Sequence, residues 1–301
     1  MIKKEKYICK RNVLLLTIFL LIGLSGCSET KDSYNDSQQN IQSESISKAQ
    51  DETSISHNIA KEKIIDWGNY FNGINGCAVV FMPAENTYYF YDKEMCEREV
   101  SPCSTFKIAS TLMGLNNQII TSEESTMDYN GANYPITEWN RDLNLKDAFQ
   151  TSCVWYFHQI VNKVGKDEVK IELEKLGYGN CDISEWDGSN INPSEDLNGF
   201  WLESSLKISP LQQTNILINI FENKTDYSRE NIDILKKIMR IDESNIYGKT
   251  GTGVDGHAWF AGFAENEEQR NYFAVYLSDD TVGGLSGYKA KEIAIRIIEN
   301  M

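Results

Sequence analysis

The sequence predicts a mixed α/β fold in which strands from both ends of the chain form one antiparallel sheet flanked by helices. Strand-like segments occur at residues 77–92 and again between residues 246 and 280. The middle of the chain has the apolar periodicity of helices, and we expect a helical subdomain at about residues 112–205. Strands at both ends with helices between them imply a sheet that distant segments complete.

The first predicted elements follow from local patterns. Residues 77–92 (CAVVFMPAENTYYFYD) are apolar and aromatic on both sides of a turn that contains Pro and Asn, so they predict two strands. From Ser104 onward, apolar residues recur at intervals of three and four, which predicts a helix, and Pro102 suits its start. The polar, tryptophan-bearing residues 125–142 predict a loop within the helical middle.

The last predicted elements are three strands and a helix. The three strand segments alternate or run apolar and are separated by Gly or Asn turns, so we expect adjacent antiparallel strands. AKEIAIRIIENM at residues 290–301 has the pattern of an amphipathic helix. The strand segments are residues 246–253, 257–266 and 271–280.

The N-terminus has the pattern of an export signal. A basic segment, residues 1–11, precedes an apolar run at residues 13–24 that is shorter than the roughly 20 residues a membrane span needs. The small residues before Cys27 resemble a bacterial lipobox. This resemblance implies a lipoprotein signal peptide at residues 1–26, lipidation of Cys27, and anchoring at the outer face of the bacterial cell membrane. An ordinary cleaved signal or a short anchor is the alternative.

Composition separates a tether from a folded domain and excludes some functions. Residues 27–60 are rich in Ser, Gln, Asn and Asp, so they predict a disordered tether ahead of a domain at residues 61–301. The formal net charge of −15 argues against nucleic acid as a partner. Three histidines without ligand spacing predict no metal. No oligomeric state is predicted.

Ser104 and Lys107 lie three residues apart, on one face of the predicted helix. A serine hydroxyl is a weak nucleophile that needs a base within hydrogen-bond reach. A lysine can be that base only where its charge is suppressed, and Phe106 and Ile108 give it apolar neighbours. The spacing alone is weak evidence, because an exposed first helical turn would give it as well.

Two further segments strengthen this interpretation. Ser152 is followed by Val154 two residues later, and Lys249-Thr250-Gly251 lies on a predicted strand. Ser-x-x-Lys, Ser-x-Val and Lys-Thr-Gly in this order are the signature of penicillin-recognising serine acyltransferases. Together with Tyr178-Gly179-Asn180 and FWLESSLKIS at residues 200–209, they resemble the class D (oxacillinase-type) serine β-lactamases over roughly residues 62–300. The penicillin-sensor domains of β-lactam receptors are similar too.

The resemblance implies a serine β-lactamase/penicillin-binding transpeptidase-like fold and a set of catalytic roles. Ser104 would form an acyl-enzyme. Lys107 would react with CO2 to give N6-carboxylysine, the general base for acylation and deacylation, with no cofactor besides CO2 or bicarbonate. Ser152 would relay a proton to the leaving nitrogen, with Lys249 beside it.

The resemblance also implies substrate contacts. Backbone N–H groups of Ser104 and Thr252 would form the oxyanion hole. Lys289 is the nearest candidate for the arginine that holds the substrate carboxylate in the family. Tyr178-Gly179-Asn180 either touches substrate or forms only a turn, and Trp201 either donates to the carbamate or is plain core. The substrate-binding candidates are Val154, Tyr178, Trp201, Thr250, Gly251, Thr252 and Lys289.

The expected function is hydrolysis of β-lactam antibiotics, penicillins by default, which would confer resistance. A sensor that stays acylated and a wall transpeptidase are the alternatives. A sensor would need transmembrane helices or a separate partner, and a transpeptidase would more often show Ser-x-Asn. A Cys/His enzyme built on His257 with Cys103 or Cys153 is a weaker alternative. Because Cys103 and Cys153 flank the two serines, a bridge between them is a further hypothesis.

Overall fold

A computed structural model describes residues 59–254, 256–267 and 269–301. The predicted signal peptide, the lipidation site Cys27 and nearly all of the predicted tether lie outside these residues, so they stay predictions. No helix within the described ranges is both long and apolar enough to span a bilayer.

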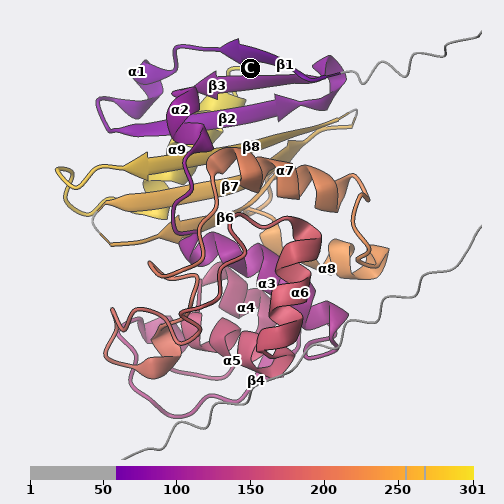
Figure 1. Ribbon diagram of the computed structural model, residues 1–301, viewed down its shortest axis with the longest axis vertical. Helices are drawn as coiled ribbons and strands as arrows, with labels where there is room; N and C mark the ends of the chain where they lie inside the picture. Colours follow the sequence, from indigo (N-terminus) through magenta and orange to yellow (C-terminus); the bar gives the residue numbers. More distant parts are fainter. Residues whose placement is uncertain (1–58, 255, 268) are drawn as a thin grey trace, which may run out of the picture. The chain divides into compact units, whose positions relative to one another are not determined.

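The sheet contains six strands in the order β1-β3-β2-β8-β7-β6, so segments from both ends of the chain do share it (Figure 1). Neighbouring strands are antiparallel except β1 and β3, which pair in parallel. The parallel pair is a departure from the predicted antiparallel sheet. The strands are β1 (Lys61–Ile64), β2 (Gly76–Met82), β3 (Thr87–Tyr91), β6 (Ile246–Thr252), β7 (His257–Glu265) and β8 (Arg270–Ser278).

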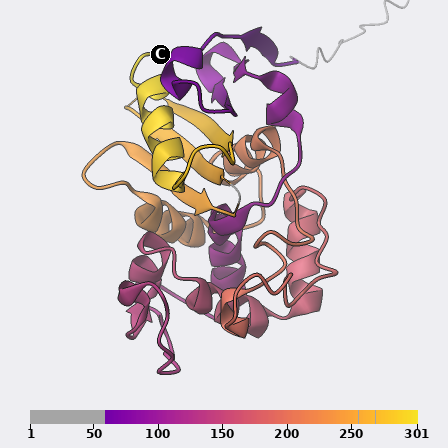
Figure 2. The same cartoon turned by 90° about the vertical axis from the view of Figure 1, so that its left-hand side faces the viewer.

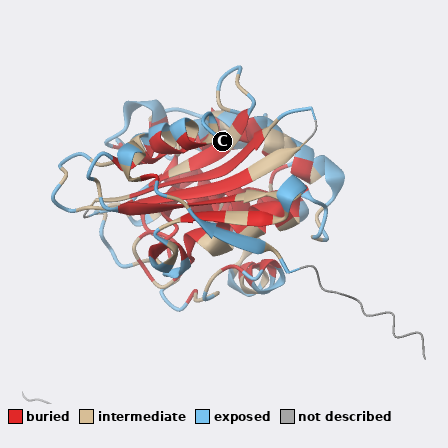
Figure 3. Cartoon of the chain, turned by 90° about the horizontal axis from the view of Figure 1, so that it is seen from above, coloured by how far each residue is buried: buried red, intermediate tan, exposed pale blue. Residues whose placement is uncertain are grey.

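Helices cover both faces of the sheet. α9 (Gly287–Ile298) packs on β6, β7 and β8, with α1 (Gly68–Phe71) beside it (Figure 2). α7 (Pro210–Phe221) and α2 (Lys93–Glu97) pack on the opposite face. The central strands are therefore buried on both sides (Figure 3). On β7, for example, Trp259 belongs to one core cluster and Phe260 to the other.

The helical region contains α3 (Lys107–Asn116), α4 (Leu145–Gln150), α5 (Val154–Val164), α6 (Lys166–Leu176) and α8 (Arg229–Met239). Much of the predicted subdomain is irregular, since residues 177–194 and most of residues 117–142 form loops. The remaining elements are the short hairpin β4 (Thr126–Met127) and β5 (Leu143–Asn144) and the 3-10 turns η1 (Pro83–Glu85), η2 (Cys103–Phe106), η3 (Thr137–Trp139) and η4 (Glu195–Leu197).

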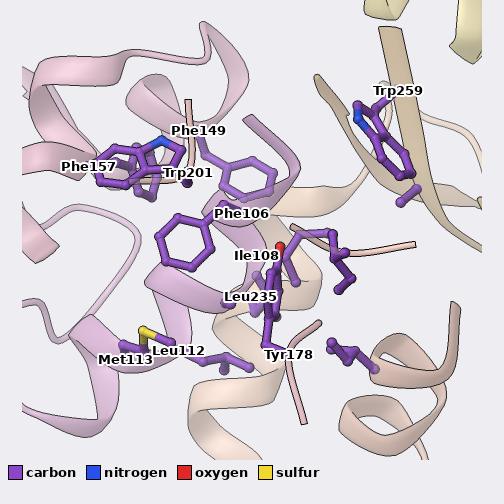
Figure 4. Close-up of a cluster of buried hydrophobic side chains, with 14 of the residues drawn as sticks. Phe106, Ile108, Leu112, Met113, Phe149, Phe157, Tyr178, Trp201, Leu235 and Trp259 are labelled. Carbon is purple, nitrogen blue, oxygen red and sulfur yellow. The ribbon is translucent and has the colours of Figure 1, made fainter. Parts of the chain in front are cut away.

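An aromatic cluster joins η2 to the loops of the helical region. Phe106 contacts Trp201 and Tyr178, with ring centroids 5.4 Å and 5.7 Å apart (Figure 4). Phe200 packs on both Phe106 and Trp201. Because Phe106 lies between Ser104 and Lys107, this packing fixes the turn that carries both residues.

Candidate active site

A cavity of about 630 Å³ lies where η2, the turn before α5 and strand β6 meet. Ser104, Ser152, Val154, Thr250 and Thr252 all line it. Three distant stretches of the chain thus bring five of the predicted site residues to one hollow. A cavity with several convergent polar groups is the usual form of a small-molecule site.

Ser104 sits on the 3-10 turn η2, and α3 begins only at Lys107. The predicted helix therefore starts three residues later than the pattern suggested. Residues 103–106 form i→i+3 bonds instead, since Thr105 N–H donates to Pro102 carbonyl oxygen and Lys107 N–H to Ser104 carbonyl oxygen. The turn still places Lys107 Nζ 2.9 Å from Ser104 Oγ, within reach for proton transfer.

Lys107 is fully buried and forms no ion pair with any residue in the described part. Its Nζ lies 5.4 Å from the centre of the Phe157 ring. Burial without a carboxylate partner lowers the pKa of Lys107 to about 8. In a substantial fraction of the molecules the Lys107 amine is therefore neutral near physiological pH. Only the neutral amine can act as a base or react with CO2.

Ser152 and Lys249 form a second serine–lysine pair. Lys249 Nζ donates to Ser152 Oγ at 3.0 Å and to the carbonyl oxygen of Thr250 at 3.0 Å. Burial, together with the nearby charge of Lys107, holds the pKa of Lys249 well below its usual value. Ser152 has a φ of 60°, and such strained residues concentrate at functional sites.

Strand β6 is at the edge of the sheet, and its free edge lies against η2. Gly253 N–H donates to His257 carbonyl oxygen at 2.9 Å, so Lys249, Gly251 and Gly253 are the positions whose backbone groups hydrogen-bond to β7. The N–H groups of Thr250 and Thr252 consequently point away from β7. Gly251 does not line the cavity, and a Cβ there would lie 3.2 Å from Pro102 carbonyl oxygen.

Trp201 is buried behind the cavity, and its indole Nε1–H has no hydrogen-bond partner among the described residues. A buried donor without an acceptor is unfavourable, by about 1–3 kcal/mol. A carbamate oxygen on the buried Lys107 side chain would supply such an acceptor. The residues present therefore fit an N-carboxylated Lys107. The donor that would bind the carbamate is Trp201, the tryptophan to which the resemblance assigns this role.

Two further predicted substrate contacts, besides Gly251 and Trp201, do not line the cavity. Tyr178 is buried against Phe106 and does not line it. A Cβ at Gly179 would lie 1.8 Å from Lys207 carbonyl oxygen, so Tyr178-Gly179-Asn180 is a tight turn that joins two chain segments. Lys289 points away as well, because its Nζ pairs with Glu292 at 2.9 Å. Tyr288 and Lys291 on the same helix flank the site instead, since Tyr288 lines the cavity and Lys291 an adjoining one beside Thr250.

Several lining residues were not predicted. Glu203 and Cys103 lie on the cavity wall, and Glu203 Oε1 accepts hydrogen bonds from Cys103 Sγ and His257 Nδ1. The motif FWLESSLKIS contained Glu203, but nothing in the sequence connected it to His257. All five cysteines in the described part are free thiols, so the hypothesised bridge between Cys103 and Cys153 is absent. Exposed apolar residues surround the mouth: Ile136, Ile191, Val254 and Tyr288.

A family model for the penicillin binding protein transpeptidase domain matches residues 71–299. The chain belongs to this family. It is 34% identical over 243 residues to the regulatory protein BlaR1 of Bacillus licheniformis and 31% identical over 251 residues to the methicillin resistance mecR1 protein of Staphylococcus aureus. It is 30% identical over 245 residues to beta-lactamase OXA-10 of Pseudomonas aeruginosa.

These relatives differ in how much of their length is matched. The three alignments cover 78%, 81% and 78% of this chain, and 38%, 41% and 88% of BlaR1, mecR1 and OXA-10. The chain therefore spans about two fifths of the length of the two regulatory relatives.

Solved structures confirm the predicted fold. A class D beta-lactamase from Bacillus subtilis superimposes with a TM-score of 0.70 at 29% identity, covering 78% of this chain and 95% of that one. The C-terminal domain of the Bacillus licheniformis BlaR penicillin-receptor gives a TM-score of 0.71 at 32% identity, covering 80% and 96%. The domain is thus homologous to class D beta-lactamases and to penicillin receptors alike.

Proposed function

We propose that this domain hydrolyses β-lactam antibiotics, penicillins by default, through an acyl-enzyme on Ser104. The observation that carries the proposal is the buried Lys107 amine, 2.9 Å from Ser104 Oγ and without an acidic partner in the described part. A base in this position can take the Ser104 proton while Oγ bonds to the lactam carbonyl carbon. The N–H groups of Ser104 and Thr252 then stabilise the negative oxygen.

The lactam C–N bond breaks next, and its nitrogen needs a proton. Ser152 Oγ can pass to it the proton that Lys107 took from Ser104, while Lys249 Nζ, 3.0 Å away, holds the Ser152 hydroxyl in place. Water then hydrolyses the Ser104 ester to release a ring-opened acid and restore the serine. Because the ring-opened product is no longer an antibiotic, this hydrolysis would make the cell resistant.

We propose that Lys107 works as N6-carboxylysine, formed from CO2 and its neutral amine with loss of one proton. Burial and the low pKa of Lys107 support this, and so does the unpaired Nε1–H of Trp201. The carbamate, when present, would supply an anionic general base for both acylation and deacylation. Val154 lines the cavity and keeps this region apolar.

We assign recognition of the substrate carboxylate to Thr250, Lys249 and Lys291. Thr250 borders both cavities, and Lys291 lines the one that adjoins it. Lys291 takes the place that the sequence alone gave to Lys289.

The second candidate is a sensor that stays acylated, and the similarity to BlaR1 and mecR1 favours it. The purified domain should be mixed with a chromogenic penicillin in bicarbonate buffer. Many turnovers per protein molecule support the enzyme. A single stoichiometric burst followed by a stable adduct on Ser104 supports the sensor, and an adduct elsewhere, or none, contradicts both.

We also propose that the chain is exported and lipid-anchored through Cys27 at the outer face of a bacterial membrane. The basic and apolar residues before Cys27 support this. Incorporation of radioactive palmitate in the wild type and its loss in Cys27→Ala would be the expected result, and labelling of both proteins would contradict it.

A further inference from the structure

Glu203 lies between the two chain segments that carry the expected oxyanion-hole donors. Its side chain is 13% exposed and lines the cavity. Oε1 accepts from Cys103 Sγ at 3.5 Å on one side and from His257 Nδ1 at 3.1 Å on the other. We propose that Glu203 is a positioning residue that holds the Ser104 and Thr252 N–H groups at a fixed separation. This inference rests on the proposed acylation of Ser104.

On the β6–β7 side, the carboxylate is in contact with the turn that follows Thr252. His257 binds both partners: its imidazole donates to Glu203, and its carbonyl oxygen accepts the Gly253 N–H at 2.9 Å. A Cβ at Gly253 would lie 1.9 Å from Glu203 Oε1. Only glycine lets the carboxylate approach the backbone this closely, immediately after Thr252.

On the nucleophile side, the backbone around Glu203 is bound to the residues before Ser104. Cys103 N–H donates to Trp201 carbonyl oxygen at 3.1 Å, and Glu203 N–H donates to Ser101 Oγ at 2.8 Å. These bonds do not involve the Glu203 side chain. Removing the carboxylate should therefore leave the backbone of residues 201–203 attached to residues 101–103. It should release the Cys103 thiol, His257 and the contact at Gly253.

The backbone at this junction is strained. Cys103 and Glu203 have φ values of 48° and 49°, although neither is glycine. Such conformations persist only where surrounding contacts hold them, and they concentrate at functional sites. The thiol–carboxylate contact joins the side chains of these two strained residues.

Glu203 is the ionised, accepting partner in this link. Burial alone would raise the pKa of Glu203, but the hydrogen bonds from His257 and Cys103 hold it below the usual value. Lys207 adds a weaker attraction, and the Tyr276 ring lies 6.0 Å from the imidazole. A carboxylate with two donors is suited to hold two segments together.

The test separates the acylation step from noncovalent binding. Fluorescent penicillin labelling of Ser104 gives the acylation rate constant and the preceding dissociation constant, whether or not the ester later hydrolyses. Because losing one oxyanion donor typically costs about 10²–10³ in rate, we expect Glu203→Ala to slow acylation by about 10- to 100-fold with the dissociation constant within about twofold. Glu203→Gln, which still accepts hydrogen bonds, should recover most of the rate.

Glu185→Gln is the matched control, because Glu185 also accepts a side-chain hydrogen bond from this segment, from Ser204, but does not line the cavity. An unchanged acylation rate in Glu203→Ala, or a loss equalled by the control, overturns the inference. If Glu203→Ala does not fold, His257→Phe and Cys103→Ala each remove one arm of the link and should each slow acylation.

A second readout does not require acylation. In 15N-labelled protein, the amide resonances of Ser104, Thr252 and Gly253 should shift together in Glu203→Ala and stay in place in Glu185→Gln. Coupled shifts in a protein that penicillin does not label would support the positioning link while contradicting the proposed function. Unshifted resonances of Thr252 and Gly253 would overturn the link itself.

Discussion

The indole of Trp201 stacks on Phe106, with ring centroids 5.4 Å apart and planes inclined by 30°. Phe106 immediately precedes Lys107, so this stack fixes the tryptophan beside the turn that carries the buried amine. The stack buries Nε1–H where the described residues offer no acceptor. Aromatic packing thus leaves a buried hydrogen-bond donor available to the carbamate proposed on Lys107.

The first prediction concerns this donor. Trp201→Phe keeps an aromatic ring on Phe106 but removes Nε1–H, so the carbamate on Lys107 should be less stable. Because a hydrogen bond to a charged group contributes about 1.5–3 kcal/mol, we expect the carbamate population at low CO2 to fall about 10- to 100-fold. 13C NMR with labelled bicarbonate measures it. An equal carbamate signal in both proteins would show that the indole has no part in binding the group.

The second prediction is a gain of stability at the expense of activity. The pKa of Lys107 is about 8 in the folded state, against an ordinary value of 10.5. Below pH 8 the buried amine is mostly charged, and its desolvation lowers the free energy of unfolding. At about 1.4 kcal/mol per pKa unit, this cost is about 3 kcal/mol at pH 7. Lys107→Met should therefore unfold at a higher temperature than the wild type while losing all turnover.

The pH dependence of this gain follows from the sign of the shift. Between pH 8 and 10.5 the unfolded chain binds more protons at Lys107 than the folded chain, so wild-type stability rises with pH there. The advantage of Lys107→Met should shrink over the same window. Denaturant unfolding in CO2-depleted buffer at pH 7, 9 and 10.5 measures it, with Lys289→Met, at a partly exposed lysine of α9, as control. A constant difference between the two proteins would contradict the assigned pKa.

The third prediction concerns the acylation rate below pH 8. Lys107 can accept the Ser104 proton or react with CO2 only as the neutral amine, and its pKa is about 8. The neutral fraction falls about tenfold for each pH unit below that value. Acylation of Ser104 at fixed CO2 should fall in proportion between pH 7.5 and 5.5, as stopped-flow measurements can show. A flat profile over this range would mean that another group is the base.

Much of the site was predictable because its residues lie in short, contiguous motifs. Ser104 and Lys107 are separated by one turn, so any helical or 3-10 conformation places their polar atoms on one side. Lys249-Thr250-Gly251 lies on a strand whose alternation is visible in the sequence. The strands near both ends of the chain were predictable for the same reason, since β2 and β8 consist mostly of apolar and aromatic residues.

What the sequence did not reveal depends on contacts between distant segments. Tyr178 has a hydroxyl that could bind a substrate, so its residue type does not show that it is buried. Only its packing against Phe106 shows that it lies in the core. Lys289 and Lys291 lie two residues apart, and only the position where α9 begins decides which of them faces Thr250. Glu203 and His257 are 54 residues apart and share no motif. Their pairing needs the β6–β7 turn to come against residues 201–203.

The last prediction distinguishes the two lysines of α9. Lys291 lines the cavity beside Thr250, whereas Lys289 lines neither cavity and pairs with Glu292. If Lys291 attracts the substrate carboxylate, Lys291→Ala should raise KM for a penicillin about 5- to 30-fold, as expected for the loss of roughly 1–2 kcal/mol from a partly exposed charge. Because this attraction acts in both the ground and transition states, kcat should change little. Lys289→Ala, which removes the same charge from the same helix, should leave both constants unchanged. Equal effects of the two substitutions would indicate only a general change in the electrostatic field of the protein. A rise in KM confined to Lys289→Ala would support Lys289, the residue assigned from the sequence.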